Sequence, residues 1–290
     1  MERRFVFRID EDYDGKDIKA LLCNHLRCSS NIISRLKKGE YIKLNGEHAT
    51  VRKQLSAGDE LVIIIPEEKN ENILPNPDIG VSVLYEDEDI LVVNKQACIA
   101  THPSVKHYDD TLANGVANYV KDKNFTFRAV NRLDRQTSGI VIIAKNMLSA
   151  HLLGEQIKTG KIKKVYYAVC EGIPRVKKGR ISAPIARESE SIIKRCVSEK
   201  GKESTTLYET IKEHNGMALV KAEPVTGRTH QIRVHLSHIG CPIYGDDMYG
   251  SVHAGERVRL HCKDIFFTHP ITGADMHVEC DFPEDFNIML

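Results

Sequence analysis

The sequence has no uninterrupted apolar run near the roughly 18 residues that a membrane-spanning helix needs. Its first 15 residues include basic side chains but no apolar core of a secretory signal, so we expect a cytoplasmic protein. The eight cysteines are scattered and none forms a C-x-x-C pair, which excludes the common zinc-ribbon and redox motifs. Without a secretory signal, these cysteines are expected to be reduced thiols.

Neither sign of charge is in excess, because 41 Lys and Arg face 40 Asp and Glu, a net charge of +1 at pH 7. This balance excludes a uniformly basic protein but not an RNA partner, since local patches bind phosphate. Residues 16–53 carry nine basic side chains against three acidic ones, and residues 158–180 carry eight against one. Residues 66–90 carry eight acidic side chains against one lysine. The charges therefore predict two separate phosphate-binding faces with an acidic segment between them.

The chain of 290 residues is long enough for about two domains, and its apolar content of 41% is typical of a globular protein. Residues 66–80 hold three prolines among polar residues and form the best candidate for a linker. We therefore predict a small domain over residues 1–65 and a larger one over residues 81–290.

The small domain follows the order helix, helix, short strands. Apolar residues at helical spacing mark a first helix near 18–26, and Ser29 and Ser30 are suited to cap a second helix. Asn45-Gly46 then predicts a tight hairpin turn before the last strand.

The larger domain mixes helical and strand patterns without regular βαβ alternation, so we predict an α+β fold with a mixed, mostly antiparallel sheet. Its strands are expected at 82–85, 90–94, 140–144, 165–170, 204–210 and 218–222. Its helices are expected near 112–120, 148–157 and 230–239.

A carboxylate lies between two arginines in Asn131-Arg132-Leu133-Asp134-Arg135, just before a Thr-Ser-Gly turn and an apolar strand. The neighbouring guanidinium groups favour the ionised carboxylate, which can act as a base or a nucleophile. A structural Asp-Arg pair that stabilises the turn explains the same spacing, and the residues alone leave both interpretations open.

A second informative stretch, residues 226–240, predicts a helix capped by Thr229. Arg228 lies at its positively polarised start, a natural anion site, so we predict that it binds RNA. Arg233 lies one turn further in, where it can hold a carboxylate through two hydrogen bonds. The stretch also allows a metal-dependent hydrolase, whose candidate ligands are His230, His235, His238 and Cys241. Their spacing matches no standard zinc template, so surface or hydrogen-bonded histidines are favoured.

The segment Lys164-Val165-Tyr166-Tyr167-Ala168 is typical of a strand, in which Tyr166 and Tyr167 point to opposite faces. One ring can pack in the core while the other faces a cleft, where a nucleobase can stack on it. Two ordinary strand tyrosines explain the pattern equally well.

Residues 15–61 resemble the S4 RNA-binding domain, through a second helix of the Ser-x-x-Ile type, the Asn-Gly hairpin and the Ala-Gly-Asp-Glu turn. In that family the two helices and the following loop present basic residues to structured RNA. The resemblance implies that four basic residues here bind RNA, namely Arg35, Lys37, Lys38 and Lys43. A solvated charged face is the alternative.

Four further motifs together resemble the RluA-type pseudouridine synthases: NRLDRQTSG (131–139), KVYYAVCEG (164–172), TGRTHQIRVHLSHIGCPIYGDDMYG (226–250) and LHCKDIFFTHPITG (260–273). The resemblance implies an α+β core with a bent, mostly antiparallel sheet and a central cleft. It also implies isomerisation of uridine to pseudouridine within RNA, with no cofactor and no metal.

By the same resemblance, Asp134 matches the family's essential aspartate and Tyr166 the tyrosine that stacks on the target base. Arg233 matches the arginine that pairs with the aspartate, and Arg132 the arginine that takes the space of the flipped nucleotide. A non-catalytic RNA-binding or ribosome-assembly factor is the alternative, against which these intact residues argue.

Two places depart from the family pattern. Asn131 replaces the usual histidine before Arg-Leu-Asp, and Gln96 and Cys98 replace the proline and glycine of Asn-Lys-Pro-x-Gly. Both changes concern the RNA site and fine positioning more than the reaction. The S4-like domain favours large-subunit ribosomal RNA as the substrate, with transfer RNA as the alternative, and we expect a monomer.

Overall fold

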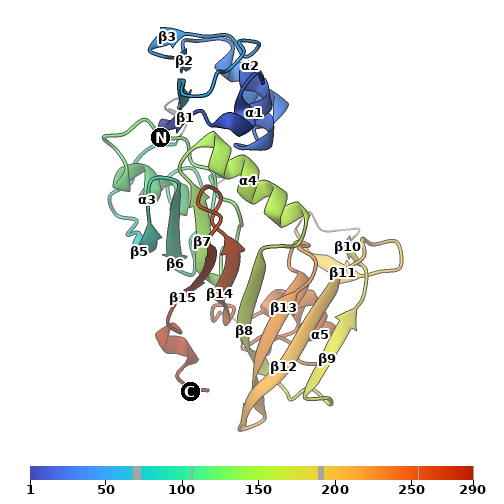
Figure 1. Cartoon of the computed structure of the whole chain (residues 1–290). Helices are drawn as coiled ribbons and strands as arrows, with labels where there is room; N and C mark the ends of the chain where they lie inside the picture. Colours follow the sequence, from blue (N-terminus) through green and yellow to red (C-terminus); the bar gives the residue numbers. More distant parts are fainter. Residues whose placement is uncertain (68–72, 106, 189–192, 254, 290) are drawn as a thin grey trace.

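The structure, a computed structural model, describes residues 1–67, 73–105, 107–188, 193–253 and 255–289. A four-stranded sheet forms from the N-terminal residues, and a nine-stranded sheet and a separate two-stranded ribbon form from the rest (Figure 1). Within these ranges no helix combines the length and the apolarity needed to cross a membrane.

The N-terminal sheet has the strand order β1-β4-β2-β3, and two short helices share its apolar core. Ser29 caps the second helix by accepting a hydrogen bond from the backbone N–H of Ile32. Asn45 and Gly46 adopt the positive φ angles of the predicted hairpin turn. The elements are β1 (Arg3–Arg8), α1 (Ile18–Asn24), α2 (Ser30–Leu36), β2 (Ile42–Leu44), β3 (Glu47–His48) and β4 (Glu60–Ile65).

The predicted order of this part is incomplete, because a strand, β1, precedes the helices. β1 pairs antiparallel with β4, with Arg3 opposite Ile65. Its side chains alternate between half-buried and exposed, and Phe5 and Phe7 lie on the half-buried side. This period of two is present in the sequence Arg-Phe-Val-Phe-Arg, and a search for helical periodicity alone misses it.

The large sheet has the order β5-β6-β7-β14-β8-β13-β12-β9, and β15 pairs with β14. β7 and β14 run parallel and the other neighbours are antiparallel, so the predicted α+β fold with a mixed, mostly antiparallel sheet is confirmed. The strands are β5 (Ser82–Glu86), β6 (Ile90–Lys95), β7 (Ser138–Ala144), β8 (Lys163–Glu171), β9 (Lys178–Ser182), β12 (Thr205–His214), β13 (Met217–Pro224), β14 (Leu260–Thr268) and β15 (Asp275–Glu279).

All six strands and three helices predicted for this region are present. The sequence patterns do not predict β9, β14, β15 or the ribbon formed by β10 (Ile185–Arg187) and β11 (Arg195–Val197). One helix starts later than predicted, because its N-cap is His230 rather than Thr229. The side chain of His230 forms no capping hydrogen bond. The helices are α3 (Leu112–Tyr119), α4 (Met147–Lys158) and α5 (Gln231–His238).

The N-terminal sheet packs against α4 (Figure 1). Leu148 and Leu152 of α4 belong to the same apolar core as residues of α1, α2 and β4. Nearby, Arg128 donates two hydrogen bonds, of 2.6 and 2.8 Å, to Glu67, whose side chain is only 1% exposed. The domain division at residues 66–80 stays a prediction, and residues 68–72 of that segment lie outside the described residues.

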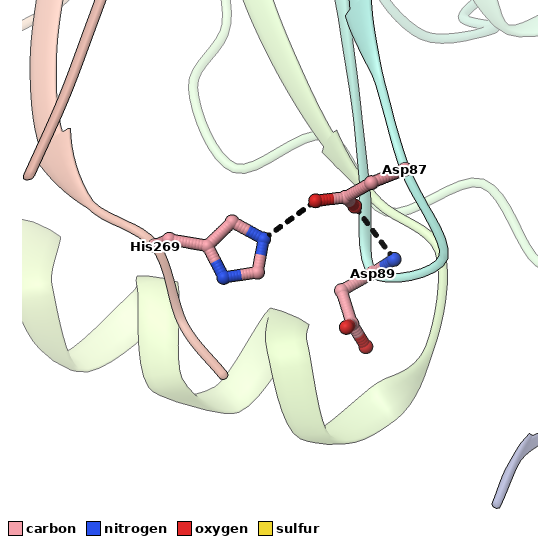
Figure 2. Close-up of side chains that lie close together, drawn as sticks. All are labelled: Asp87, Asp89 and His269. Carbon is pink, nitrogen blue, oxygen red and sulfur yellow. Dashed lines mark hydrogen bonds and ion pairs between the residues drawn. The ribbon is translucent and has the colours of Figure 1, made fainter. Parts of the chain in front are cut away.

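A polar network ties β1 to two turns of the large sheet. Asp87 accepts hydrogen bonds from the backbone N–H of Asp89 and from Nε2 of His269, each of 2.8 Å (Figure 2). His269 Nδ1 accepts the backbone N–H of Thr272 at 3.0 Å, so Nε2 carries the ring proton. Asp89 accepts a hydrogen bond of 3.1 Å from Arg3 Nε. Two carboxylates and a histidine resemble a metal site, but both ring nitrogens are engaged in these hydrogen bonds, so the cluster is structural.

Replacing Arg128 with methionine should destabilise the protein, because the buried carboxylate of Glu67 would lose its guanidinium partner. Glu67 keeps the hydrogen bonds from the amino group of Met1 at 2.9 Å and from the hydroxyl of Thr126 at 3.1 Å. We therefore expect the free energy of unfolding in urea at pH 7 to fall by about 1–2 kcal/mol. Burial alone would raise the pKa of Glu67, but the hydrogen bonds from Arg128 bring it below its ordinary value. The contribution of the pair is therefore present at neutral pH and is lost as the pH falls through the pKa of the folded state.

The matched control is Arg175→Met, which removes an exposed arginine from the loop before β9. Its free energy of unfolding should change by less than about 0.5 kcal/mol. Equal losses in the two variants would show that the Glu67–Arg128 pair does not stabilise the fold.

Candidate active site

A cavity of about 290 Å³ opens between the loop that leads into β7, the strand β8 and the loop that leads into α5. Its walls include the three residues predicted to be catalytic, Asp134, Tyr166 and Arg233. Arg132 and Arg228, two of the residues predicted to bind RNA, also line it. Three segments that are far apart in the sequence therefore meet at one hollow.

The loop that carries Asp134 is fastened to β7 by Asn131. The buried side chain of Asn131 donates to the carbonyl of Ile140 and accepts the backbone N–H of Ile142, both at 2.9 Å. Asn131 thus links the start of the loop to a backbone carbonyl and a backbone N–H of β7. The residue that departs from the family pattern therefore helps to position the loop.

Gly139 allows β7 to approach β14 closely at the end of this loop. Its φ of +114° lies in the region that favours glycine, and a Cβ there would collide with the backbone of Cys262. The Thr-Ser-Gly turn thus needs its glycine for steric reasons, because the turn brings the Asp134 loop against the parallel pair of β7 and β14.

Arg233 is held in place by a second carboxylate, that of Asp246, in addition to its contact with Asp134. Its Nε and Nη2 donate to the two oxygens of Asp246 at 2.7 and 2.8 Å, and Asp246 is completely buried. The remaining nitrogen, Nη1, lies 3.5 Å from Oδ2 of Asp134. Burial alone would lower the pKa of Arg233, but the hydrogen bonds to Asp246 raise it above its ordinary value, so the guanidinium stays charged. The sequence patterns do not single out Asp246, whose signal is an acidic residue soon after an inward-facing helical arginine.

Tyr166 and Tyr167 lie on opposite faces of β8, as the strand alternation predicts. Tyr166 is buried and lines the cavity, whereas Tyr167 packs edge-on against Phe282 with ring centroids 5.0 Å apart. Burial and the neighbouring Cys262 thiol raise the pKa of Tyr166 well above its ordinary value, so its hydroxyl keeps its proton at neutral pH. Lys164 lines the same cavity, and burial lowers its pKa.

Lys95 is completely buried behind the Asp134 loop, and the sequence patterns do not identify it as a site residue. Its Nζ donates to the carbonyls of Gln96, Ile99 and Arg135 at 2.7, 2.9 and 3.3 Å. Burial lowers the pKa of Lys95 to about 7, and the carboxylate of Asp134 opposes this shift. Because Arg135 follows Asp134 directly, Lys95 fixes the backbone beside the carboxylate.

The turn after Lys95, which departs from the family pattern, places Cys98 in a conformation that favours glycine. Cys98 has a φ of +67°, in the left-handed region that favours the family's glycine. A non-glycine residue in this conformation costs about 1 kcal/mol or more, and the surrounding hydrogen bonds offset this strain.

The four basic residues predicted from the S4-like segment lie apart from the cavity. Lys37 borders a separate groove of about 310 Å³, together with His48 and Arg52. By contrast, Arg132 and Arg228 are exposed at the cavity itself. The basic residues therefore occupy two places. Those of the N-terminal part are Arg35 in α2, Lys37 and Lys38 in the turn after α2, and Lys43 in β2.

The proposed metal ligands of residues 230–241 do not converge. Both ring nitrogens of His235 are engaged, Nδ1 with the hydroxyl of Thr206 at 2.9 Å and Nε2 with the carbonyl of Ala183 at 3.0 Å. Nδ1 of His230 lies 2.8 Å from the hydroxyl of Tyr249. In the part of the chain that the structure describes, these residues form no group able to share an ion, so the hydrolase hypothesis has no support.

Comparison with known proteins agrees with this geometry. A family model described as RNA pseudouridylate synthase matches residues 89–238. An uncharacterised RNA pseudouridine synthase of Bacillus subtilis, YjbO, is 36% identical over 91% of this chain and 95% of its own length. The ribosomal large subunit pseudouridine synthase D of Pseudomonas aeruginosa is 32% identical over 89% of this chain and 85% of its own.

The solved structure of human RNA pseudouridylate synthase domain containing 1 superposes with a TM-score of 0.62. It is 28% identical in sequence and covers 74% of this chain and 87% of its own. The fold, the family match and the curated relatives lead to one conclusion. The chain belongs to the RluA/RluD-type RNA pseudouridine synthases, which are isomerases.

Proposed function

We propose that this enzyme isomerises a uridine in large-subunit ribosomal RNA, with Asp134 as the essential carboxylate. The observation that carries the catalytic assignment is that Asp134 lies beside a charged Arg233 in the cavity that Tyr166 also lines. The name of the Pseudomonas aeruginosa relative supports the choice of RNA. We further propose that the enzyme is a cytoplasmic monomer that acts without a cofactor or metal.

The residues around the cavity have complementary roles in this reaction. A uridine in a folded RNA must leave its stack before its glycosidic bond can be reached, at a cost of a few kcal/mol. Stacking on Tyr166 and occupation of the vacated space by Arg132 offset that cost. Asp134, charged and oriented by Arg233, then acts while the glycosidic bond is broken, the uracil turns and C5 is joined to the sugar.

The substrate assignment is tested by mapping pseudouridines in total RNA from a strain that lacks the gene. We expect at least one large-subunit site to lose its pseudouridine, to regain it with the wild-type gene and not with Asp134→Asn. The variant protein should bind the RNA with a Kd within about threefold of wild type, because one neutral amide replaces one carboxylate of similar shape. Loss confined to transfer RNA would redirect the substrate assignment, and full activity of Asp134→Asn would refute the role of the carboxylate.

Lys37 and Lys38, in the turn after α2, should contribute phosphate contacts. Replacing both Lys37 and Lys38 with glutamine should weaken RNA binding and reduce the slope of log K against log salt by about 2, one for each lost contact. The measurement is a series of binding titrations from low to high salt. The same changes at Lys121 and Lys123, which are exposed after α3, provide the matched control. An unchanged slope in the Lys37/Lys38 variant would place the RNA elsewhere.

A further inference from the structure

We propose that His230 is a positioning residue that holds Asp134 together with Arg233, with its ring proton kept on Nε2 by Tyr249. The proposal rests on the proposed role of Asp134 and adds a second donor to that carboxylate. His230 lines the cavity at the start of α5, and neither the strand and helix patterns nor the family resemblance gives it a role in catalysis.

The hydroxyl of Tyr249 determines which ring nitrogen of His230 is protonated. Its oxygen accepts the backbone N–H of Arg195 at 2.9 Å and lies 2.8 Å from Nδ1 of His230. Tyr249 is buried, and among the described residues Nδ1 is the acceptor within reach of its hydroxyl proton. Because a buried hydroxyl is expected to donate, Nδ1 accepts and the proton of the neutral ring resides on Nε2.

The protonated nitrogen faces Asp134. Nε2 lies 3.8 Å from Oδ2, the same oxygen that Nη1 of Arg233 approaches to 3.5 Å. Across the described ranges, Oδ1 of Asp134 takes part in none of the hydrogen bonds, which leaves it available to the target nucleotide. Both distances exceed a full hydrogen bond, and contacts of this kind in a substrate-free site commonly tighten when the substrate binds.

The ring acts as a neutral donor. Burial lowers the pKa of His230, while the carboxylate of Asp134 opposes the shift. A second full positive charge beside Arg233 is therefore avoided at neutral pH, and Nε2–H orients the carboxylate without competing with the guanidinium for charge.

The backbone of His230 is strained in a way that serves this contact. Its φ of +58° and ψ of +19° lie in the left-handed region, which costs a non-glycine residue roughly 1–3 kcal/mol. The side chain does not repay that cost by capping α5. It contacts Tyr249 instead, whose ring also lies 5.0 Å from the guanidinium carbon of Arg233. Tyr249 thus supports both donors to Asp134.

Three variants separate the donor from the backbone strain: His230→Gln, His230→Asn and His230→Ala. The amide nitrogen of glutamine can reach the position of Nε2, whereas that of asparagine lies near Nδ1, although asparagine tolerates the left-handed backbone better. In single-turnover assays on the mapped RNA, we expect the glutamine variant to keep its rate constant within about fivefold of wild type. The asparagine and alanine variants should lose at least about 20-fold, with the RNA Kd changed less than about threefold.

Tyr249→Phe keeps the ring beside Arg233 but removes the donor to Nδ1. It should lower the rate constant on its own and have no further effect in the His230→Ala variant, since both act through one contact. Thermal melts of all variants identify any loss that comes from unfolding, and the comparison of the glutamine and asparagine variants remains decisive among the folded ones.

Two results would overturn the proposal. One is equal rate constants for the glutamine and asparagine variants, and the other is an effect of His230→Ala confined to the Kd, which would make His230 an RNA contact. Asp134→Asn in the same assay separates the two levels of the account. If it is inactive while His230→Ala is fully active, only the role of His230 is wrong, whereas an active Asp134→Asn refutes the role of both residues.

Discussion

The buried ion pair between Arg233 and Asp246 is the interaction on which the rest of the site depends. Removing both charges from water is costly, and the paired hydrogen bonds of 2.7 and 2.8 Å compensate for this only because their geometry is fixed. The pair uses two of the three guanidinium nitrogens and leaves the third directed at Asp134. In the mechanism proposed here, the orientation of the Asp134 carboxylate therefore depends on Asp246, which is completely buried behind Arg233.

Further hydrogen bonds fix the backbone of the loop that carries Asp134. Lys95 binds the carbonyl of Arg135, and Asn131 ties the start of the loop to β7. These contacts hold the loop backbone, so that the side chain of Asp134 needs only weak contacts of its own. In the proposed mechanism, a loop restrained in this way orients its carboxylate before the substrate arrives, which lowers the entropy lost in reaching the reactive geometry.

The N-terminal sheet is also fixed relative to the site, since its apolar core includes residues of α4. Leu148 and Leu152 of α4 contact that sheet's core, while Ile157 near the other end of the helix lines the cavity. One helix therefore contacts both the apolar core of the N-terminal sheet and the cavity. An RNA that contacts both the basic residues of the N-terminal part and the cavity meets them at a separation set by α4.

Much of this was open to prediction, because periodicity and turn chemistry are local. The helix cap at Ser29, the Asn45-Gly46 turn and the opposite faces of Tyr166 and Tyr167 follow from neighbouring residues and are present in the structure. The residues that the patterns miss act through distant partners. Lys95 resembles an ordinary strand-end lysine until the fold brings Arg135 to it. The pairing of Asp246 with Arg233 has only one local signal, an acidic residue soon after a helical arginine. His230 is expected as the first residue of a helix, whereas the structure places it at the N-cap in a left-handed conformation, with Nδ1 2.8 Å from the hydroxyl of Tyr249.

The central claim, that a fixed guanidinium holds the carboxylate of Asp134 ready for the reaction, is tested most directly at Arg233. Arg233→Lys keeps the positive charge but cannot bind both oxygens of Asp246 and reach Asp134 at once. The measurement is the single-turnover rate constant of pseudouridine formation beside the Kd for the same RNA. In the Arg233→Lys variant we expect the rate constant to fall about 100-fold or more, while the Kd stays nearly unchanged. A lysine variant as fast as the wild type would show that charge alone is sufficient and would contradict the account.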